Sequence, residues 1–459
     1  MSNISNLIES QRRFFFENKT KEINFRKGQL IKLKKVLKAN ESKFYDAIYK
    51  DMKKSEFEAY ATELGLVYNE INFAIRNLDK WAKTKKVKTN LVNFPGKSII
   101  IPEPLGNCLI IGAKNYPYQL SLAPLVPAIA AGNTAIIKPS ELTPNSSNAL
   151  AEIINQNFPG EFICVVEGGI ETISELINNK FDKIFFTGSS RVGRVILEVA
   201  SKHLTPVTLE LGGKSPAIVM PDANLKIAAK RIALGKFLNA GQTCIAPDYL
   251  LLHKTIKVEF LKLLCDEINK KYGNTALNSE AYIQIIDHKS FVNLVGLIDK
   301  GKIYFGGNFN EEELFISPTI LDNVSFDDKI MENEIFGPIL PVIEFNNLDE
   351  IIHKLKQHPK SLSLYIFTKS KSDWEKIIHE ISFGGGAIND TLMQTLNPNL
   401  PFGGVGYSGI GNYHGEAGFK TFSHYKSILK KSTLFDPIIK YPPYKTWKLN
   451  ILKWLLEWV

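Results

Sequence analysis

The first 85 residues have the apolar spacing that is typical of helices. Apolar side chains recur three or four positions apart, for example at Leu30, Leu33 and Leu37, so that they share one helical face. Pro95 then interrupts the pattern, and residues 98–101 are an isoleucine-rich run that is typical of a strand. The sequence therefore predicts a helical N-terminal layer followed by a first strand.

From residue 106 onward, short apolar runs alternate with helical stretches. The expected strands are residues 107–111, 134–137, 163–166, 183–186 and 206–211. One expected helix follows the first strand and ends at Ala131, and the other three span residues 147–155, 172–178 and 190–203. Continuous apolar strands that alternate with helices predict a parallel, doubly wound sheet, and such sheets bind ligands at the carboxyl ends of their strands. Residues 217–415 repeat a mixed pattern, so the predicted fold class is α/β with a second α/β domain.

The composition indicates a large globular protein. Of the 459 residues, 44% are hydrophobic and 22% are charged, which fits two or three domains with a substantial core. The net charge of +9 predicts a basic solvated surface, or contact with an anionic membrane surface or an acidic ligand. We expect no nucleic-acid partner, because its recognition motifs are missing. The chain shows no signal-peptide pattern and no run of ~20 apolar residues, so we expect a cytoplasmic protein.

Cys244 differs from the other three cysteines in its surroundings. Cys108, Cys164 and Cys265 lie in apolar runs and are expected to fill the core. No CxxC spacing occurs, so no disulfide or metal site is predicted. Cys244 instead follows a Gly-Gln-Thr segment and precedes Pro247, which indicates a turn where a thiol can be exposed near backbone N–H groups. A free thiol has a pKa of about 8.5, so we expect local dipoles or a base to increase the thiolate fraction.

Other candidate residues follow the predicted strands of the sheet. Glu210 ends the fifth strand and is either a salt-bridged strand end or a general base whose pKa burial raises. Asn115 follows the first strand and is either a turn residue or a donor to a developing oxyanion. The loop from Gly188 to Gly193 opens a helix, where backbone N–H groups can bind a phosphate. It lacks the Lys-Ser/Thr ending of a P-loop, which disfavours hydrolysis of a nucleoside triphosphate.

With these motifs in place, the chain resembles the NAD(P)-dependent aldehyde dehydrogenases from about residue 10 to residue 435. The motifs that carry the resemblance are Asn115-Tyr116-Pro117, Lys138-Pro139-Ser140-Glu141, Phe186-Thr187-Gly188-Ser189, the segment 209–216, Gly241-Gln242-x-Cys244, Glu334-Ile335-Phe336-Gly337-Pro338 and Pro401-Phe402-Gly403-Gly404. Two further segments, 246–249 and 411–415, look like the class 3 branch, which includes the fatty-aldehyde enzymes.

The resemblance implies an activity and a domain plan. The activity is oxidation of an aldehyde, medium- or long-chain aliphatic or aromatic, to the carboxylic acid with NAD or NADP, through a cysteine thiohemiacetal and thioester. The plan is a dinucleotide-binding domain at residues 1–85 and 104–208, a catalytic domain at 209–415, a small β oligomerisation segment at 86–103 and 416–440, and a tail at 441–459. Class 3 relatives commonly form dimers, so we expect a homodimer.

The resemblance also assigns roles to individual residues. Cys244 is the nucleophile, Glu210 the base, and Asn115 an oxyanion donor together with the Cys244 backbone N–H. The implied cofactor-binding residues are Lys138 and Glu141 at the adenosine ribose, Gly188 and Ser189 at the pyrophosphate, Glu334 at the nicotinamide ribose and Phe336 near the nicotinamide ring. Glu141 at the ribose disfavours a 2′-phosphate, so the pattern favours NAD slightly over NADP.

One departure from the family pattern and three alternative functions stay open. Lys114 stands where the family usually has an aromatic residue, so we expect it to alter the substrate funnel or to place a positive charge beside the site. A coenzyme A-acylating enzyme is disfavoured by Glu210, which favours water as acceptor. A non-catalytic homologue would predict loss of Cys244, Glu210 or Asn115. A thiol hydrolase without a cofactor would not need the Gly188 loop.

Residues 446–459 have the pattern of a short amphipathic helix. Its apolar face consists of Trp447, Ile451, Trp454 and Trp458, and its polar positions include Lys448. The helix is too short to span a bilayer, but a Trp-rich amphipathic helix can lie on a lipid surface. The fatty-aldehyde relatives carry a C-terminal membrane anchor, so two interpretations stay open, namely packing of the helix on its own dimer and peripheral membrane contact through residues 446–459.

Overall fold

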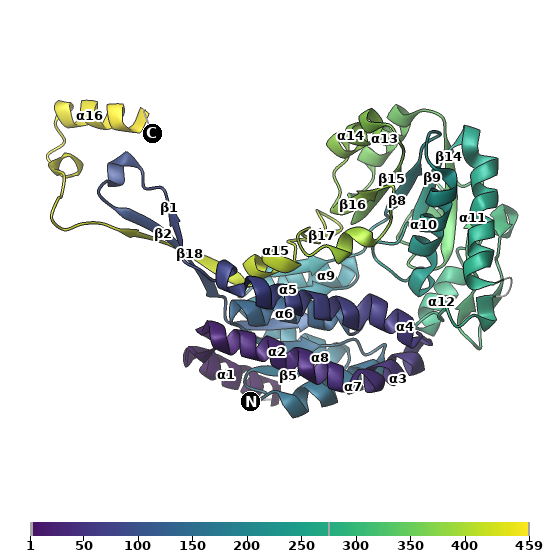
Figure 1. Cartoon of the computed structure of the whole chain (residues 1–459), viewed down its shortest axis with the longest axis horizontal. Coiled ribbons are helices and arrows are strands. Elements are labelled where there is room, and N and C mark those ends of the chain that lie inside the picture. The colour runs from purple at the N-terminus through teal and green to yellow at the C-terminus, as the bar shows by residue number, and fades with distance from the viewer. Residues whose placement is uncertain (1–2, 274–275, 458–459) are drawn as a thin grey trace.

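The computed structural model describes residues 3–273 and 276–457, and it consists of two lobes and a projecting arm (Figure 1). The N-terminal segment is helical, as predicted, with α1 (Asn3–Phe16), α2 (Ile23–Ala39), α3 (Glu41–Met52), the short α4 (Glu56–Ala59) and α5 (Gly65–Trp81). Leu30, Leu33 and Leu37 of α2 are fully buried. The apolar face of α2 therefore packs against the first lobe.

The first lobe is built around a six-stranded sheet with the order β17-β7-β6-β3-β4-β5. Its parallel strands are β3 (Asn107–Ile111), β4 (Thr134–Lys138), β5 (Ile163–Val165), β6 (Lys183–Thr187) and β7 (Val207–Glu210). They alternate with α6 (Gln119–Ala131), α7 (Pro144–Asn157), α8 (Ile170–Asn178) and α9 (Ser190–Ser201). The predicted parallel α/β sheet is thereby confirmed.

The second lobe contains a seven-stranded sheet with the order β10-β13-β14-β9-β8-β15-β16. Its strands are β8 (Pro216–Val219), β9 (Tyr249–His253), β10 (Ile303–Phe305), β13 (Thr319–Leu321), β14 (Ile339–Phe345), β15 (Ser363–Phe367) and β16 (Gly385–Ile388), and β11 (Phe309–Asn310) with β12 (Phe315–Ile316) forms a separate ribbon. The helices are α10 (Leu225–Phe237), α11 (Lys257–Tyr272), α12 (His288–Val295), α13 (Leu348–Gln357) and α14 (Lys371–Glu380).

The chain crosses between the lobes twice, once before the first strand of the second sheet and once after its last strand. The boundary expected at residue 209 falls inside β7, whose last residue is Glu210. The chain returns to the first sheet at β17 (Gly409–Ile410), which pairs with Leu209 and Glu210, and then forms α15 (Gly415–Thr421) against α6. Glu210 consequently lies at the junction of the two lobes.

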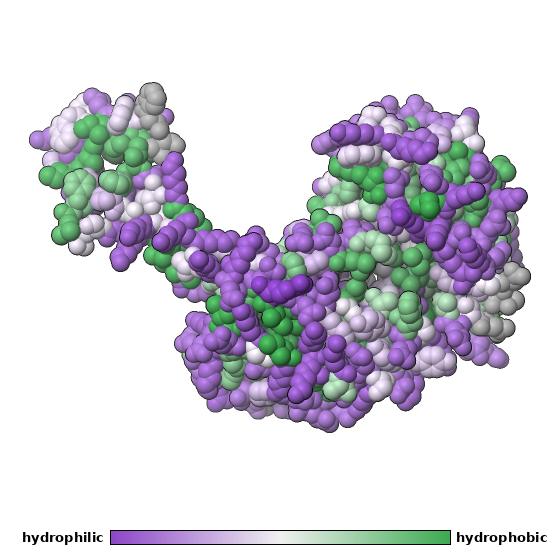
Figure 2. All heavy atoms as spheres, in the orientation of Figure 1, coloured by the Kyte–Doolittle hydropathy of each residue, from purple (hydrophilic) through white to green (hydrophobic). Residues whose placement is uncertain are grey.

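The arm is an antiparallel sheet of β1 (Lys85–Val87), β2 (Lys97–Pro104) and β18 (Ser423–Lys430), with β2 in the middle. It projects away from both lobes, and α16 (Thr446–Glu457) lies at its tip (Figure 1). Figure 2 shows apolar surface gathered on the arm. None of the helices in residues 3–273 and 276–457 has the length and apolarity that a membrane crossing requires.

Candidate active site

Cys244 lies in a turn that follows α10. Three consecutive residues before it, Asn239, Ala240 and Gly241, have φ values of 56°, 50° and 72°, a left-handed conformation that is costly for residues with a side chain. A Cβ on Gly241 would lie 2.3 Å from the carbonyl oxygen of Gly337. The turn therefore requires glycine there, and it delivers a half-buried Cys244 to the wall of a cavity of about 320 Å³.

Asn115 joins the two lobes next to this turn. Its side-chain Nδ2 donates to the carbonyl oxygen of Gln242 at 2.9 Å, and its own carbonyl oxygen accepts from Nδ2 of Asn239 at 3.1 Å. Asn115 is 3% exposed. The loop after β3 and the turn after α10 are thus held together by side-chain amides, which places Asn115 within the turn that carries Cys244.

Glu210 is a buried carboxyl group without a hydrogen-bond partner. Neither Oε1 nor Oε2 has a partner among the described residues, and the side chain is 3% exposed. Burial raises the pKa of Glu210 well above its usual range, because an unpaired carboxylate is costly in a low-dielectric environment. The expected salt bridge at the strand end is not formed among the residues described, and the environment is the one that the general-base hypothesis requires.

The Cys244 thiol does not show the lowered pKa that the sequence led us to expect. Burial raises its pKa, and the nearby carboxylates of Glu334 and Glu210 raise it further, while the backbone N–H groups of Cys244 and Ile245 act in the opposite direction. The dipoles of the turn are present, but desolvation outweighs them. Cys244 therefore lies close enough to Glu210 and Glu334 for their charges to oppose its ionisation.

A second cavity, of about 380 Å³, lies between residues of both lobes. Ser189 of the first lobe and Gly212, Lys214 and Glu334 of the junction and second lobe contribute to its wall. Ser189 precedes α9 and accepts from the Val192 backbone N–H at 3.4 Å. A Cβ on Gly212 would lie 1.8 Å from Oε2 of Glu334, so only glycine leaves room for this carboxyl group. Burial raises the pKa of Glu334 to about 8.

The remaining predicted cofactor residues are not among those that line this cavity. The buried Lys138 donates from Nζ to Oε2 of the partly exposed Glu141 at 2.7 Å. Gly188 lies beside Ser189, and a Cβ there would meet the Phe186 ring at 2.5 Å. Phe336 has a φ of 52°. The structure thus brings Ser189 and Glu334 together at one cavity, with Lys138 and Glu141 forming a separate ion pair.

Lys114 does not reach the cavity at Cys244. Its Nζ pairs with the Asp287 carboxylate and donates to Oγ of Ser290 at 2.9 Å, and Lys114 is not among the residues that line the cavity. Asp287 at the start of α12 pairs with the ammonium group, and the effect of Lys114 on the substrate funnel or on the charge beside the site stays a prediction.

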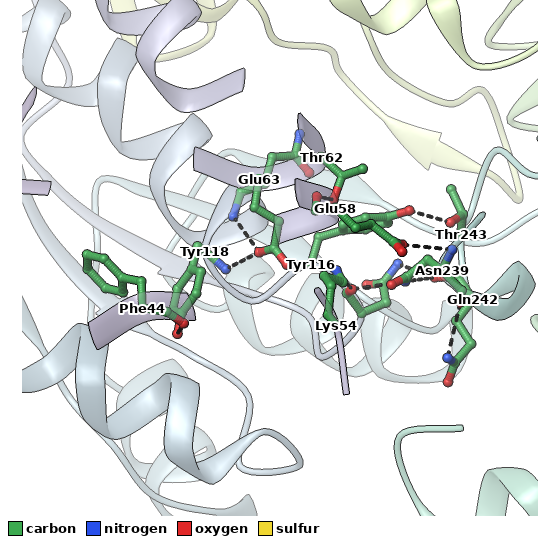
Figure 3. A network of polar contacts seen from close by, with 12 residues as sticks. Phe44, Lys54, Glu58, Thr62, Glu63, Tyr116, Tyr118, Asn239, Gln242 and Thr243 are labelled. Atoms are coloured by element: carbon green, nitrogen blue, oxygen red, sulfur yellow. Dashed lines mark hydrogen bonds and ion pairs between the residues drawn. The ribbon is translucent and has the colours of Figure 1, made fainter. Parts of the chain in front are cut away.

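Sequence reasoning assigned no separate role to several residues around the site. His414 lines the Cys244 cavity, and burial lowers its pKa to about 4, so the ring is neutral at neutral pH. Lys54, Glu58 and Glu63 form a buried polar network beside Asn115 and Asn239 (Figure 3). In the sequence these three look like ordinary polar positions of helices, and no local signal marks them.

Comparisons with known proteins point to one family. The model of the aldehyde dehydrogenase family matches residues 2–428. A 4,4'-diaponeurosporen-aldehyde dehydrogenase from Staphylococcus aureus is 49% identical over 446 residues, which cover 96% of this chain and 97% of that protein. Aldehyde dehydrogenase family 3 member A2 from Mus musculus is 41% identical over 447 residues, 97% of this chain and 92% of that protein. The substrate-bound state of Staphylococcus aureus AldH superposes with a TM-score of 0.97 at 48% identity, covering 99% of this chain and 100% of that chain.

Proposed function

Because the chain belongs to the aldehyde dehydrogenase family, we propose that its Cys244 thiol forms the covalent intermediate by which the protein oxidises aldehydes. The chain is an NAD(P)-dependent aldehyde dehydrogenase, and the predicted resemblance to the class 3 branch is confirmed. The observation that carries the proposal is that Cys244 lines one cavity and Glu334 lines the other, with the buried, unpartnered carboxyl group of Glu210 at the junction of the two lobes.

Each catalytic candidate has a defined task in this reaction. After the Cys244 thiol has lost its proton, the thiolate sulfur bonds to the carbonyl carbon of the aldehyde. The C=O π pair moves to the oxygen, and the Asn115 amide and the Cys244 backbone N–H stabilise its negative charge. When bound, the nicotinamide ring supplies the acceptor for the hydride. Glu210 removes a proton from water, which then attacks the thioester carbon and releases the carboxylic acid and the free thiol. The unpartnered, buried carboxyl of Glu210 supports this role.

The residues around the second cavity fit a dinucleotide. Glu334 lies against Gly212, which has no room for a side chain, and its carboxyl group is suited to a ribose hydroxyl. Ser189 and Gly188 precede α9, where the helix N-terminus favours a pyrophosphate. We assign Lys138 and Glu141 to the adenosine ribose and Phe336 to the nicotinamide side on the strength of the family motifs.

The cavity at Cys244 supports an apolar substrate. Its wall includes Leu120, Ile245, Leu392 and Phe402. Among the described residues that line it there is no Asp, Glu, Lys or Arg, and the ionisable groups are the thiol, the tyrosines and His414. Such a lining binds apolar carbon chains and rings and disfavours charged substrates. We therefore assign medium- or long-chain aliphatic and aromatic aldehydes as the substrate class.

The experiment that tests this function is an initial-rate series with straight-chain aldehydes of increasing length, using NAD and NADP in parallel. We expect kcat/KM to rise with chain length, because each buried CH₂ adds about 0.8 kcal/mol of transfer free energy, and Cys244→Ala to abolish reduction of the cofactor. Cys164→Ala, at a thiol outside the cavity, is the matched control and should keep the activity. Near-native turnover by Cys244→Ala would show that the thiol is not the nucleophile.

We also assign two interfaces to the arm. The outer edge of β18 has no partner strand among the described residues, and an open edge can pair with a second copy of the chain, which supports a homodimer. At the arm tip, Trp447, Ile451 and Trp454 of α16 are exposed, which supports peripheral contact with a lipid surface. Trp458, the fourth residue of the predicted face, lies outside the described residues.

A further inference from the structure

Lys54 and Glu63 form an ion pair in the protein interior. Nζ of Lys54 lies 2.8 Å from Oε1 of Glu63, and both side chains are 0% exposed. A buried ion pair is often no more stabilising than apolar residues of the same shape, because both charges lose their hydration. Stability alone therefore does not explain why this pair is buried beside the catalytic candidates.

The ion pair holds both ends of the segment that carries Asn115. Lys54 donates from Nζ to the carbonyl oxygen of Asn115 at 3.4 Å and lies 4.4 Å from the ring centroid of Tyr116. The second carboxylate oxygen of Glu63 accepts from the backbone N–H groups of Tyr118 and Gln119, at 2.8 Å and 3.3 Å, where α6 begins. Negative charge is favourable at a helix N-terminus, so Glu63 anchors α6 while Lys54 anchors Asn115.

Glu58 connects the same cluster to the turn of Cys244. Its Oε1 accepts from the backbone N–H of Asn239 at 3.0 Å, and the Asn239 amide donates to the carbonyl oxygens of Asn115 and Gln242 at 3.1 Å and 3.0 Å (Figure 3). Burial raises the pKa of Glu58, and the Lys54 ammonium opposes that effect. Lys54 thus lies near the carboxyl groups of both Glu58 and Glu63. Glu63 holds the end of the loop after β3, and Glu58 holds the turn after α10.

Glu63 lies within a π-helical turn over Tyr60–Leu64, which begins two residues after Glu58. In an α-helix, residues five apart point about 140° away from each other. The wider π-helical turn reduces this angle, so Glu58 and Glu63 both face Lys54. Such turns are frequent at functional sites.

We propose that Lys54, Glu63 and Glu58 are positioning residues that set the orientation of the Asn115 amide relative to the Cys244 sulfur, and thereby the rate of the steps up to hydride release. The inference rests on the proposed role of Asn115 as oxyanion donor. The three residues line neither cavity, so they act through the Asn115 carbonyl, the start of α6 and the Asn239 backbone.

The experiment is a double-mutant cycle with the full chain and saturating NAD. Lys54→Met combined with Glu63→Gln removes both charges, keeps side chains of similar size, and retains an amide oxygen for the N–H groups of Tyr118 and Gln119. We expect the thermal midpoint to stay close to that of the wild type, while the single-turnover rate of NADH formation falls about tenfold and KM for the aldehyde stays unchanged. In an Asn115→Ala background, the same pair of substitutions should cause no further decrease.

The controls separate positioning from stability. Asp51→Asn alters another buried carboxylate that receives backbone N–H groups at a helix start, those of Asn145 and Ser146 at α7, and should leave the rate of NADH formation unchanged. If the Lys54/Glu63 variant does not fold, Glu58→Gln replaces it in the same cycle, because its amide oxygen still accepts from Asn239.

Each outcome decides the proposal. An unchanged NADH rate in the folded variant, or an equal decrease in the wild-type and Asn115→Ala backgrounds, overturns the positioning role and leaves the proposed function intact. If Asn115→Ala itself reduces cofactor at the wild-type rate, the oxyanion role of Asn115 fails first, and the positioning role fails with it.

Discussion

At the scale of single residues, Glu210 and Cys244 lie in surroundings that favour their uncharged forms. Burial raises the pKa of both groups, and each carboxylate near Cys244 adds to the effect. A carboxyl group with a raised pKa is a stronger base once it is deprotonated, which suits it to activate water. Under the proposed mechanism, both groups have to lose a proton before they act as nucleophile and base.

We predict that Glu210→Gln slows thioester hydrolysis by roughly 100-fold and lets acyl-enzyme accumulate, which intact-protein mass spectrometry detects. Because the folded pKa of Glu210 is raised, its carboxylate fraction grows as the pH rises above the usual carboxyl range. The hydrolysis rate of the wild type should therefore increase with pH over this interval, and the increase should disappear in Glu210→Gln. Normal turnover without an acyl adduct in that variant would exclude Glu210 as the base. Glu152→Gln, at an exposed carboxyl group, is the matched control.

At the scale of elements, the exposure of the side chains of α16 agrees only in part with the amphipathic pattern of its sequence. The apolar positions Trp447, Ile451 and Trp454 are exposed, as membrane contact requires, but Lys448 is 3% exposed and donates from Nζ to the carbonyl oxygen of Tyr441 at 2.7 Å. This polar position of the helix is therefore not exposed, because its side chain packs against the segment before the helix. The helix therefore exposes Trp447 and Trp454.

We predict that the full chain sediments with vesicles that contain anionic lipid, whereas a chain of residues 1–440 stays in the supernatant. The apolar face of α16 and the positive net charge of the protein both favour such a surface, and added salt should weaken the binding. Trp454→Lys in the full chain is the matched variant and should also reduce sedimentation. Equal sedimentation of the long and short chains would assign α16 to packing within the dimer.

At the scale of the whole molecule, the arm is the part that lies farthest from the shared core. β18 pairs with β2 over eight residues and leaves its other edge open among the residues described. An open strand of this length is a template for pairing unless charges or a partner cover it. The arm is thus the surface on which a second copy of the chain can complete a sheet.

We predict a particle of twice the 51.6 kDa chain mass in light scattering, and a shift toward monomer for Ile428→Lys. Ile428 is partly exposed on β18, and a lysine on an edge strand opposes pairing. Val258→Lys, on the exposed surface of α11, is the control and should stay dimeric. A dimer that survives Ile428→Lys would place the interface outside the edge of β18.

Local patterns in the sequence determined the class of the fold and the neighbourhood of the site. Apolar periodicity depends only on residues a few positions apart, so it located the strands of the first sheet to within one or two residues. It also placed Asn115 in the loop after β3 and Glu210 at the end of β7. The turn residues around Cys244 marked it in the same way. Family, fold and aldehyde oxidation are confirmed, while the roles of individual site residues stay predictions that the geometry supports.

The tertiary structure alone decided which charges meet and which are desolvated. The raised pKa of Cys244, the capture of Lys114 by Asp287 and the burial of Lys448 depend on segments distant in the chain or on the packing around them. The ion pair between Lys54 and Glu63 forms in a segment with a π-helical turn, and no local pattern in the sequence predicts either feature. Electrostatic free energy depends on distance and on exclusion of water in three dimensions, and the one-dimensional pattern contains neither quantity.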